Sequence, residues 1–171
     1  MIVHDNKIFA LTTGQHTFTT EEGFYSKSLG TTVFEKPLNP IALALISGAT
    51  FVARGYALWI DHLKYIIKEA ILHNGFSFIE VLQPCITFHD LRLYYEKRMY
   101  KLEDVGHDPT NFEEALRKSL EYDYTMKEEA KIPVGIFYRS ERQTLEAGLG
   151  AKEWYKITRT FNREVLELAK I

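Results

Sequence analysis

The chain has 171 residues, of which 46% are hydrophobic and 26% charged, and its formal net charge is −2. This is the composition of one ordinary globular domain, and its dispersed basic residues argue against nucleic acid or an anionic membrane surface as a partner. No apolar run is long enough to cross a membrane, and nothing at the start resembles a signal peptide. The single cysteine, Cys85, excludes an intrachain disulfide and makes a cytoplasmic location the expectation.

The predicted strands and helices alternate in the first half of the chain. Asn39-Pro40 is typical of a helix start, and the apolar spacing after Asp61 predicts a second helix that Gly75 ends. The predicted segments in chain order are the end of a buried strand at 2–3, a loop at 11–20, a helix at 40–46, a strand at 50–53, a helix at 61–75 and a strand at 76–82. This order predicts an α/β fold with a mostly parallel sheet flanked by helices.

The second half is more helical in its pattern. Helices are predicted near 91–100 and over 111–126, and one strand is predicted near 134–138. An apolar stripe that begins at Trp154 and ends at Leu168 predicts a C-terminal helix. The sequence therefore predicts a helical extension after the α/β part.

Two polar stretches follow predicted strands, at 5–20 and 83–89, where open α/β sheets bind their ligands. Asn6 offers a carbonyl oxygen that suits Mg²⁺, and the threonine hydroxyls with the Gly14 backbone could receive a diphosphate. On composition alone, a hydrogen-bonded turn without a ligand is the better explanation of the same residues.

Cys85 and His89 lie in the second of these stretches. A thiolate after a strand could bind a cluster or attack a substrate, while a lone cysteine is more often a buried and inert thiol. His89 has no partner at metal-ligand spacing, and we expect it to be a surface or capping residue.

Several motifs resemble those of 2-oxoacid:ferredoxin oxidoreductase beta subunits and occur in the same order as in that family. Residues 5–15, DNKIFALTTGQ, are similar to the second half of the thiamine diphosphate motif of that family. Residues 37–40 (PLNP), 48–54 (GATFVAR) and 75–85 (GFSFIEVLQPC) also match, and the resemblance extends over roughly residues 1–140. It implies a partial thiamine diphosphate-binding fold.

In that family the beta subunit binds thiamine diphosphate, Mg²⁺ and a [4Fe–4S] cluster. The resemblance implies Mg²⁺ ligands at the side chain of Asn6 and the carbonyl of Ile8, and a cluster ligand at Cys85. Thr12 is expected beside the cofactor and Leu11 is expected to face the substrate. Since leucine cannot hydrogen-bond a keto acid, Leu11 also suggests a longer or more varied 2-oxoacid than pyruvate.

The implied activity is oxidative decarboxylation of a 2-oxoacid, with electrons passing through the cluster to ferredoxin and an acyl group passing to coenzyme A. The implied partners are an alpha subunit, ferredoxin, coenzyme A and the 2-oxoacid. Cofactor chemistry of this kind belongs to thiamine diphosphate itself, so the protein's part is to bind and orient it.

The sequence also departs from the family. The Gly-Asp-Gly that opens the family motif does not occur here, and a [4Fe–4S] cluster needs more thiolates than one. The chain therefore resembles the C-terminal half of a beta subunit, with residues 1–86 as part of the cofactor domain and 87–171 as the C-terminal extension.

From these departures we expect a missing N-terminal half to complete the sites. We also expect no catalytic residue in this chain alone, and little activity from it when isolated. The alternative is a non-catalytic remnant or interaction module that keeps part of the fold.

Overall fold

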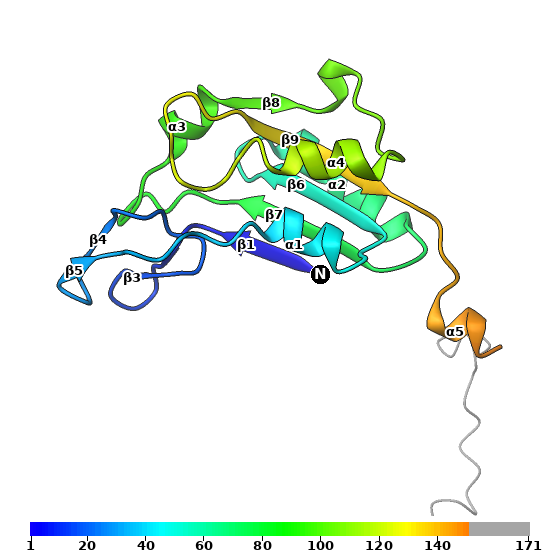
Figure 1. The fold of residues 1–171 in the computed structure, drawn as a ribbon, viewed down its shortest axis with the longest axis horizontal. Coiled ribbons are helices and arrows are strands. Elements are labelled where there is room, and N and C mark those ends of the chain that lie inside the picture. Colours follow the sequence, from blue (N-terminus) through cyan, green and yellow to red (C-terminus); the bar gives the residue numbers. More distant parts are fainter. Residues whose placement is uncertain (151–171) are drawn as a thin grey trace, which may run out of the picture. The chain divides into compact units, whose positions relative to one another are not determined.

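The computed structural model describes residues 1–150 (Figure 1). The chain divides into two compact units, Met1–Glu141 and Arg142–Ile171. In the second unit the described residues form one short helix, α5 (Leu145–Gly148), whose first turn is capped by the Thr144 hydroxyl. The C-terminal helix predicted from Trp154 lies outside the described residues.

A five-stranded sheet organises the first unit, and its strand order is β1-β7-β6-β9-β8. β1 and β6 both run parallel to β7, and β8 runs parallel to β9, while β6 and β9 are antiparallel. The strands are β1 (Ile2–Asp5), β6 (Phe51–Tyr56), β7 (Ser77–Leu82), β8 (Met99–Lys101) and β9 (Ile132–Arg139). The predicted mostly parallel α/β sheet is therefore confirmed, although the sequence pattern does not predict β8.

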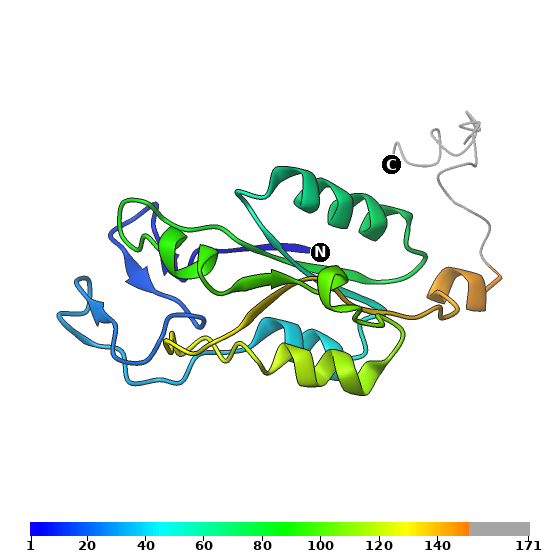
Figure 2. The same cartoon turned by 90° about the horizontal axis from the view of Figure 1, so that it is seen from above.

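Helices cover both faces of this sheet, as Figure 2 shows, with α2 on one side and α1 and α4 on the other. Separate groups of buried apolar side chains fill the two sides. The helices are α1 (Pro40–Ile46), α2 (Ile60–Leu72), α3 (Arg92–Glu96), the 3₁₀ helix η1 (Glu103–Val105) and α4 (Phe112–Ser119). Asn39 begins α1 as predicted, since its Oδ1 accepts the amide of Ala42 at 3.0 Å. No helix within residues 1–150 is long and apolar enough to span a membrane.

Two helices are shorter than their patterns indicate. The helix predicted near 91–100 ends early because residues 99–101 form β8. The helix predicted over 111–126 ends at Ser119, because the following segment turns into the core. Tyr124 in that segment is buried and has φ of +65°, a left-handed conformation that a right-handed helix excludes.

β1 lies at one edge of the sheet. Its four residues pair with β7, and among residues 1–150 its other edge has no partner strand. Ile2 is 46% exposed, so the expectation of a buried strand is wrong for the described part of the chain. A groove of about 590 Å³ runs beside β1 and α1, with Val3, Leu43, Phe76 and Phe78 among the side chains that line it.

Two short hairpins follow β1 in sequence. They are β2 (Ile8–Phe9) with β3 (Gln15–His16), and β4 (Tyr25–Ser26) with β5 (Thr31–Thr32). Both belong to the long connection between β1 and α1, which lies at the end of the sheet where β1 finishes (Figure 1).

A buried network of charged and phenolic groups joins the central strands. Arg54 lies wholly in the core, where its Nε donates to Glu80 at 2.6 Å and its Nη2 to the Tyr124 hydroxyl at 2.7 Å. Its Nη1 donates to the Pro133 carbonyl at 3.1 Å, and the Tyr124 hydroxyl donates to Glu80. Burial alone lowers the pKa of Arg54, but Tyr124 and Glu80 outweigh it and leave that pKa raised. The network thus connects β6, β7, β9 and the segment after α4.

Glu80→Gln removes the carboxylate that faces Arg54 in the core. Because the guanidinium stays buried without its counter-charge, we expect the free energy of unfolding to fall by about 3–5 kcal/mol. Urea unfolding followed by circular dichroism measures this loss. The control is Glu69→Gln, which breaks the partly exposed Arg139–Glu69 pair and should cost less than about 1 kcal/mol. Equal losses in the two variants would contradict a special role for the buried pair.

Candidate functional site

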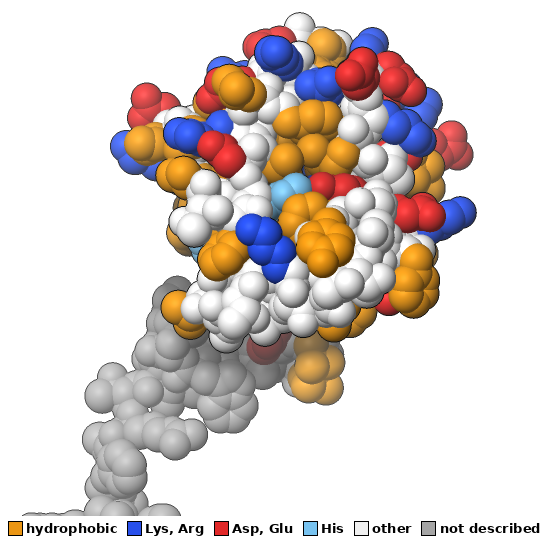
Figure 3. All heavy atoms as spheres, turned by 90° about the vertical axis from the view of Figure 1, so that its left-hand side faces the viewer, with side chains coloured by type: hydrophobic (Ala, Val, Ile, Leu, Met, Phe, Trp, Pro, Cys, Tyr) orange, Lys and Arg blue, Asp and Glu red, His pale blue; other side chains and the backbone are white. Residues whose placement is uncertain are grey.

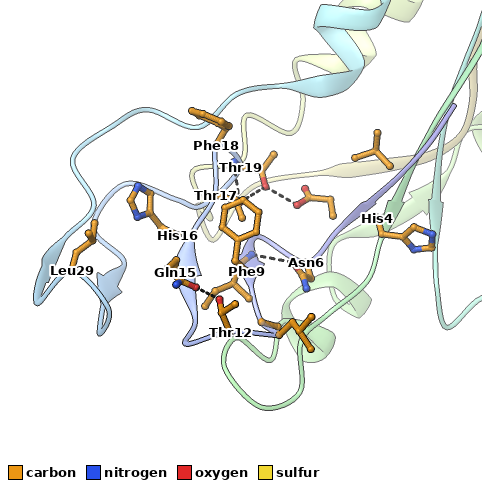
Figure 4. A pocket seen from close by; sticks show the side chains of 15 residues that line it. His4, Asn6, Phe9, Thr12, Gln15, His16, Thr17, Phe18, Thr19 and Leu29 are labelled. Atoms are coloured by element: carbon orange, nitrogen blue, oxygen red, sulfur yellow. Dashed lines mark hydrogen bonds between the residues drawn. The ribbon is translucent and has the colours of Figure 1, made fainter.

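A cavity of about 890 Å³ opens at the end of β1 (Figure 4). Its lining comes almost entirely from β1 and the connection that follows it. The lining residues are 3–6, 8–12, 15–19 and Leu29. Hydroxyl, amide and imidazole groups lie there together with the rings of Phe9 and Phe18, so the cavity offers both polar and apolar contacts.

Four of the five site residues predicted from the sequence line this cavity. Ile8 is buried and Asn6 is half-buried, whereas Thr12 is exposed and Leu11 is 99% exposed at the rim. The Thr12 hydroxyl donates to the side-chain oxygen of Gln15. Cys85, the fifth predicted residue, lies outside the cavity lining.

The turn that carries Asn6 is held by side chains acting on their own backbone. Asp5 Oδ1 accepts the Lys7 amide at 2.9 Å, and Asn6 Oδ1 accepts the Ile8 amide at 3.1 Å. These two successive Asx turns bend the chain sharply as it leaves β1. Lys7 has φ of +57°, which costs about 1–2 kcal/mol in a residue other than glycine.

The polar groups of the cavity fit a hard cation and a diphosphate in part. The oxygens of Asn6 and of the Ile8 backbone are of the kind that coordinates Mg²⁺, and the threonine hydroxyls can donate hydrogen bonds to phosphate oxygens. Asp5 Oδ2 and His16 Nδ1 are buried without a hydrogen-bond partner among the described residues, so each can still meet a ligand. Across residues 1–150, no three or more His, Cys, Asp or Glu side chains gather as a metal site.

The loop after β7 packs against the loop that encloses the cavity. Gly14 has φ of +74°, and a Cβ built on it would lie 2.9 Å from Phe88 Cδ1. Glycine is therefore required here both for its backbone conformation and for the closeness of the Phe88 ring. Phe88 belongs to a small loop that Cys85 opens, closed by a hydrogen bond from the His89 amide to the Cys85 carbonyl at 2.9 Å.

Cys85 itself is half-buried and has a free thiol. A [4Fe–4S] cluster is held by four thiolates, and the sequence contains one cysteine. The residues of this chain therefore do not fit such a cluster by themselves.

His89 connects the loop after β7 to the connection between β1 and α1. The expectation that His89 is a surface or capping residue is therefore wrong. Its Nε2 lies 3.0 Å from Glu21 Oε1, and its ring packs edge-on against Phe24 with centroids 4.6 Å apart. Burial raises the pKa of Glu21, but its contact with His89 and the charge of Lys7 outweigh this and leave the pKa below its usual value. Sequence spacing could not reveal this pair, because its members come from loops 68 positions apart.

Comparison with known proteins places these features in a family. Residues 1–81 match the family model described as thiamine pyrophosphate enzyme, C-terminal TPP binding domain. Residues 85–156 match the model described as the C-terminal part of the pyruvate ferredoxin oxidoreductase beta subunit. The cavity lies within the first match, and the Cys85 loop begins the second.

Individual relatives agree with both matches. The chain is 44% identical over 150 residues to 2-oxoacid:ferredoxin oxidoreductase 1, subunit beta, of Aeropyrum pernix, covering 81% of this chain and 45% of that protein. It is 44% identical over 153 residues to the 2-oxoacid:ferredoxin oxidoreductase subunit beta of Saccharolobus solfataricus, covering 82% of this chain and 48% of that protein. The chain thus spans about half the length of the curated relatives it matches.

A solved structure has the same fold. It is a 2-oxoglutarate:ferredoxin oxidoreductase from Magnetococcus marinus with 2-oxoglutarate, coenzyme A and succinyl-CoA bound. The two chains share 26% identity with a TM-score of 0.76, over 99% of this chain and 57% of that one. The predicted kinship is confirmed: the chain belongs to the family of 2-oxoacid:ferredoxin oxidoreductase beta subunits.

Proposed function

We propose that this chain forms the C-terminal half of a beta subunit and that its cavity beyond β1 holds the diphosphate end of thiamine diphosphate with Mg²⁺. The observation that carries the proposal is the gathering of Asn6, Ile8, Leu11 and Thr12 around one cavity within the region that matches a TPP-binding domain. When bound, thiamine diphosphate supplies the nucleophilic carbon needed to decarboxylate a 2-oxoacid.

Each cavity residue has a distinct proposed task. The Asn6 side chain and the Ile8 carbonyl bind Mg²⁺ through oxygen, and the Thr12 hydroxyl lies beside the cofactor. Leu11, on the exposed rim, faces the 2-oxoacid and offers it an apolar contact without a hydrogen bond. This chemistry accommodates a substrate with a longer or more varied side chain than that of pyruvate.

The whole enzyme then carries out oxidative decarboxylation of a 2-oxoacid, with ferredoxin as electron acceptor and coenzyme A as acyl acceptor. The names of the relatives and the ligands of the Magnetococcus marinus structure support this assignment. Within the chain, we assign residues 1–86 to the C-terminal part of the cofactor domain and 87–171 to the C-terminal extension. The change from one family match to the other between residues 81 and 85, close to this division, supports it.

The site is completed by the remaining half of a beta subunit, whether that half belongs to the same polypeptide or to a separate one. It supplies the further Mg²⁺ ligand and three thiolates that join Cys85 around a [4Fe–4S] cluster. Among residues 1–150, one edge of β1 has no partner strand, and an apolar groove lies beside it. Both features support this proposal, because such an edge and groove favour a covering partner.

The loops around the cavity are covered by the alpha subunit. Large apolar side chains are exposed on this end of the first unit, and Figure 3 shows hydrophobic side chains gathered there around a histidine. Exposed patches of this kind mark sites of protein association. The exposed side chains on these loops are Phe9, Leu11, Phe18, Tyr25, Leu29, Phe34, Ile86 and Phe88.

Two functions are considered, half of a cofactor-binding beta subunit and a non-catalytic interaction module. Measuring cofactor binding by the chain alone and by an assembled subunit distinguishes them. We expect calorimetric titration with thiamine diphosphate and Mg²⁺ to detect little binding to the chain alone. Binding should appear after assembly with the unmatched N-terminal half of the Aeropyrum pernix relative, because that half completes the metal site. Absence of binding in both samples would favour a non-catalytic interaction module, and equal binding would make the second half unnecessary.

Asn6→Ala removes the proposed side-chain ligand of Mg²⁺. In the assembled subunit we expect the affinity for thiamine diphosphate to fall by at least about tenfold, because loss of a metal-site group typically has this effect. Titration at several Mg²⁺ concentrations measures the loss. Asn74→Ala, which changes an exposed asparagine after α2, is the matched control and should bind normally. If the thiamine diphosphate affinity of Asn6→Ala depends on Mg²⁺ as in the wild type, Asn6 is not a Mg²⁺ ligand.

A further inference from the structure

Lys7 stands next to the proposed ligands Asn6 and Ile8, yet its side chain points away from solvent into the core. The ammonium is completely buried and donates to the carbonyl of Thr19 at 2.6 Å and to the carbonyl of Tyr124 at 2.9 Å. Thr19 belongs to the cavity lining, whereas Tyr124 is 117 positions away in the segment after α4. One side chain therefore joins the cavity turn to the far part of the unit.

Further contacts surround the same ammonium. Its Nζ lies 5.2 Å from the centroid of the Tyr124 ring and 5.7 Å from that of Tyr122, distances at which a cation interacts with an aromatic face. Glu21 Oε2 lies 3.6 Å away and provides the counter-charge. The buried ammonium thus has two hydrogen bonds, a nearby counter-charge and two aromatic rings around it.

The backbone of Lys7 is held as firmly as its side chain. Its amide donates to Asp5 Oδ1, and its carbonyl accepts the Thr20 hydroxyl. These contacts keep Lys7 left-handed, and the Tyr124 residue that receives its ammonium is left-handed as well. Strained backbone of this kind persists where its surroundings over-determine it, and it gathers at functional sites.

A core that needed only stability would not favour this arrangement. Burying an ammonium carries a large desolvation penalty, and a well-packed apolar side chain of similar volume often stabilises a core equally well or better. Lys7 combines that penalty with a strained φ at one position, directly between two cavity residues.

We propose that Lys7 is a positioning residue of the cofactor cavity, which anchors the turn that presents Asn6 and Ile8 to the ligand. Its contacts with the Thr19 and Tyr124 carbonyls hold this turn from two sides. Through Tyr124, the region that matches the second family model helps to shape the cavity of the first. The inference rests on the proposed function for the identity of the ligand.

Lys7→Met tests this role because methionine keeps the length of the side chain and removes its charge. In the subunit assembled as above, we expect affinity for thiamine diphosphate at saturating Mg²⁺ to fall by at least about tenfold. Amide hydrogen exchange at residues 6–9 should become faster by a similar factor, and by more than exchange elsewhere in the first unit. The urea midpoint should fall, because the carbonyls of Thr19 and Tyr124 lose their donor and Glu21 loses its counter-charge. Lys118→Met removes another paired lysine, one that bonds Tyr100 and Glu121 outside the cavity, and should leave binding and this exchange unchanged.

The outcomes separate the two proposals. If the wild-type assembly binds no thiamine diphosphate, the proposed function fails, and the role of Lys7 toward that cofactor fails with it. If wild type and Lys7→Met bind alike and exchange alike, only the role of Lys7 is overturned. Should Lys7→Met not fold, Thr20→Val loosens the same turn by removing the hydroxyl on the Lys7 carbonyl. That variant must also bind the cofactor more weakly, and unchanged binding would overturn the proposal.

Discussion

The ion pair between Arg54 and Glu80 is the interaction on which the rest of the structure depends. Both side chains are completely buried, and they lie on the neighbouring central strands β6 and β7. A buried guanidinium needs acceptors for its donors, and each of the three nitrogens of Arg54 donates a hydrogen bond, one to β7, one to β9 and one to the Tyr124 hydroxyl. The position of Tyr124 in turn decides where the Lys7 ammonium can bind. A charge placed in the middle of the sheet thereby determines the turn at its edge.

Much of the fold could be predicted from local patterns. β7 is apolar at nearly every position, which indicates a strand covered on both sides, and Asn39 with Pro40 marks the start of α1. The failures lie where a distant partner decides the local structure. Residues 120–126 have a helical pattern, but the Tyr124 side chain binds Arg54 and Glu80 in the core, and its backbone is left-handed.

The candidate site, too, has a part that could be predicted from local sequence and a part that depends on distant residues. All but one of the residues that line the cavity belong to one stretch, residues 3–19, so their proximity follows from their closeness in sequence. The groups that hold the motif come from elsewhere: Tyr124 binds Lys7, and His89 binds Glu21. No periodicity marks such pairs, because each joins segments that the chain brings together only after folding. His89 illustrates this, since its sequence neighbours suggest an exposed residue whereas Glu21 and Phe24 enclose it.

The antiparallel direction of β9 has a consequence for how the family can vary. β1, β6 and β7 finish at the same end of the sheet. β9 begins at that end because it runs antiparallel to β6. The connection that precedes β9, residues 120–131, consequently lies at the end of the sheet that carries the cavity, although it is far along the chain. A substitution in this connection can therefore change the surroundings of the proposed cofactor cavity while residues 5–15 stay unchanged. A specificity determinant sought only among the residues after β1 would overlook this second, independently variable contribution.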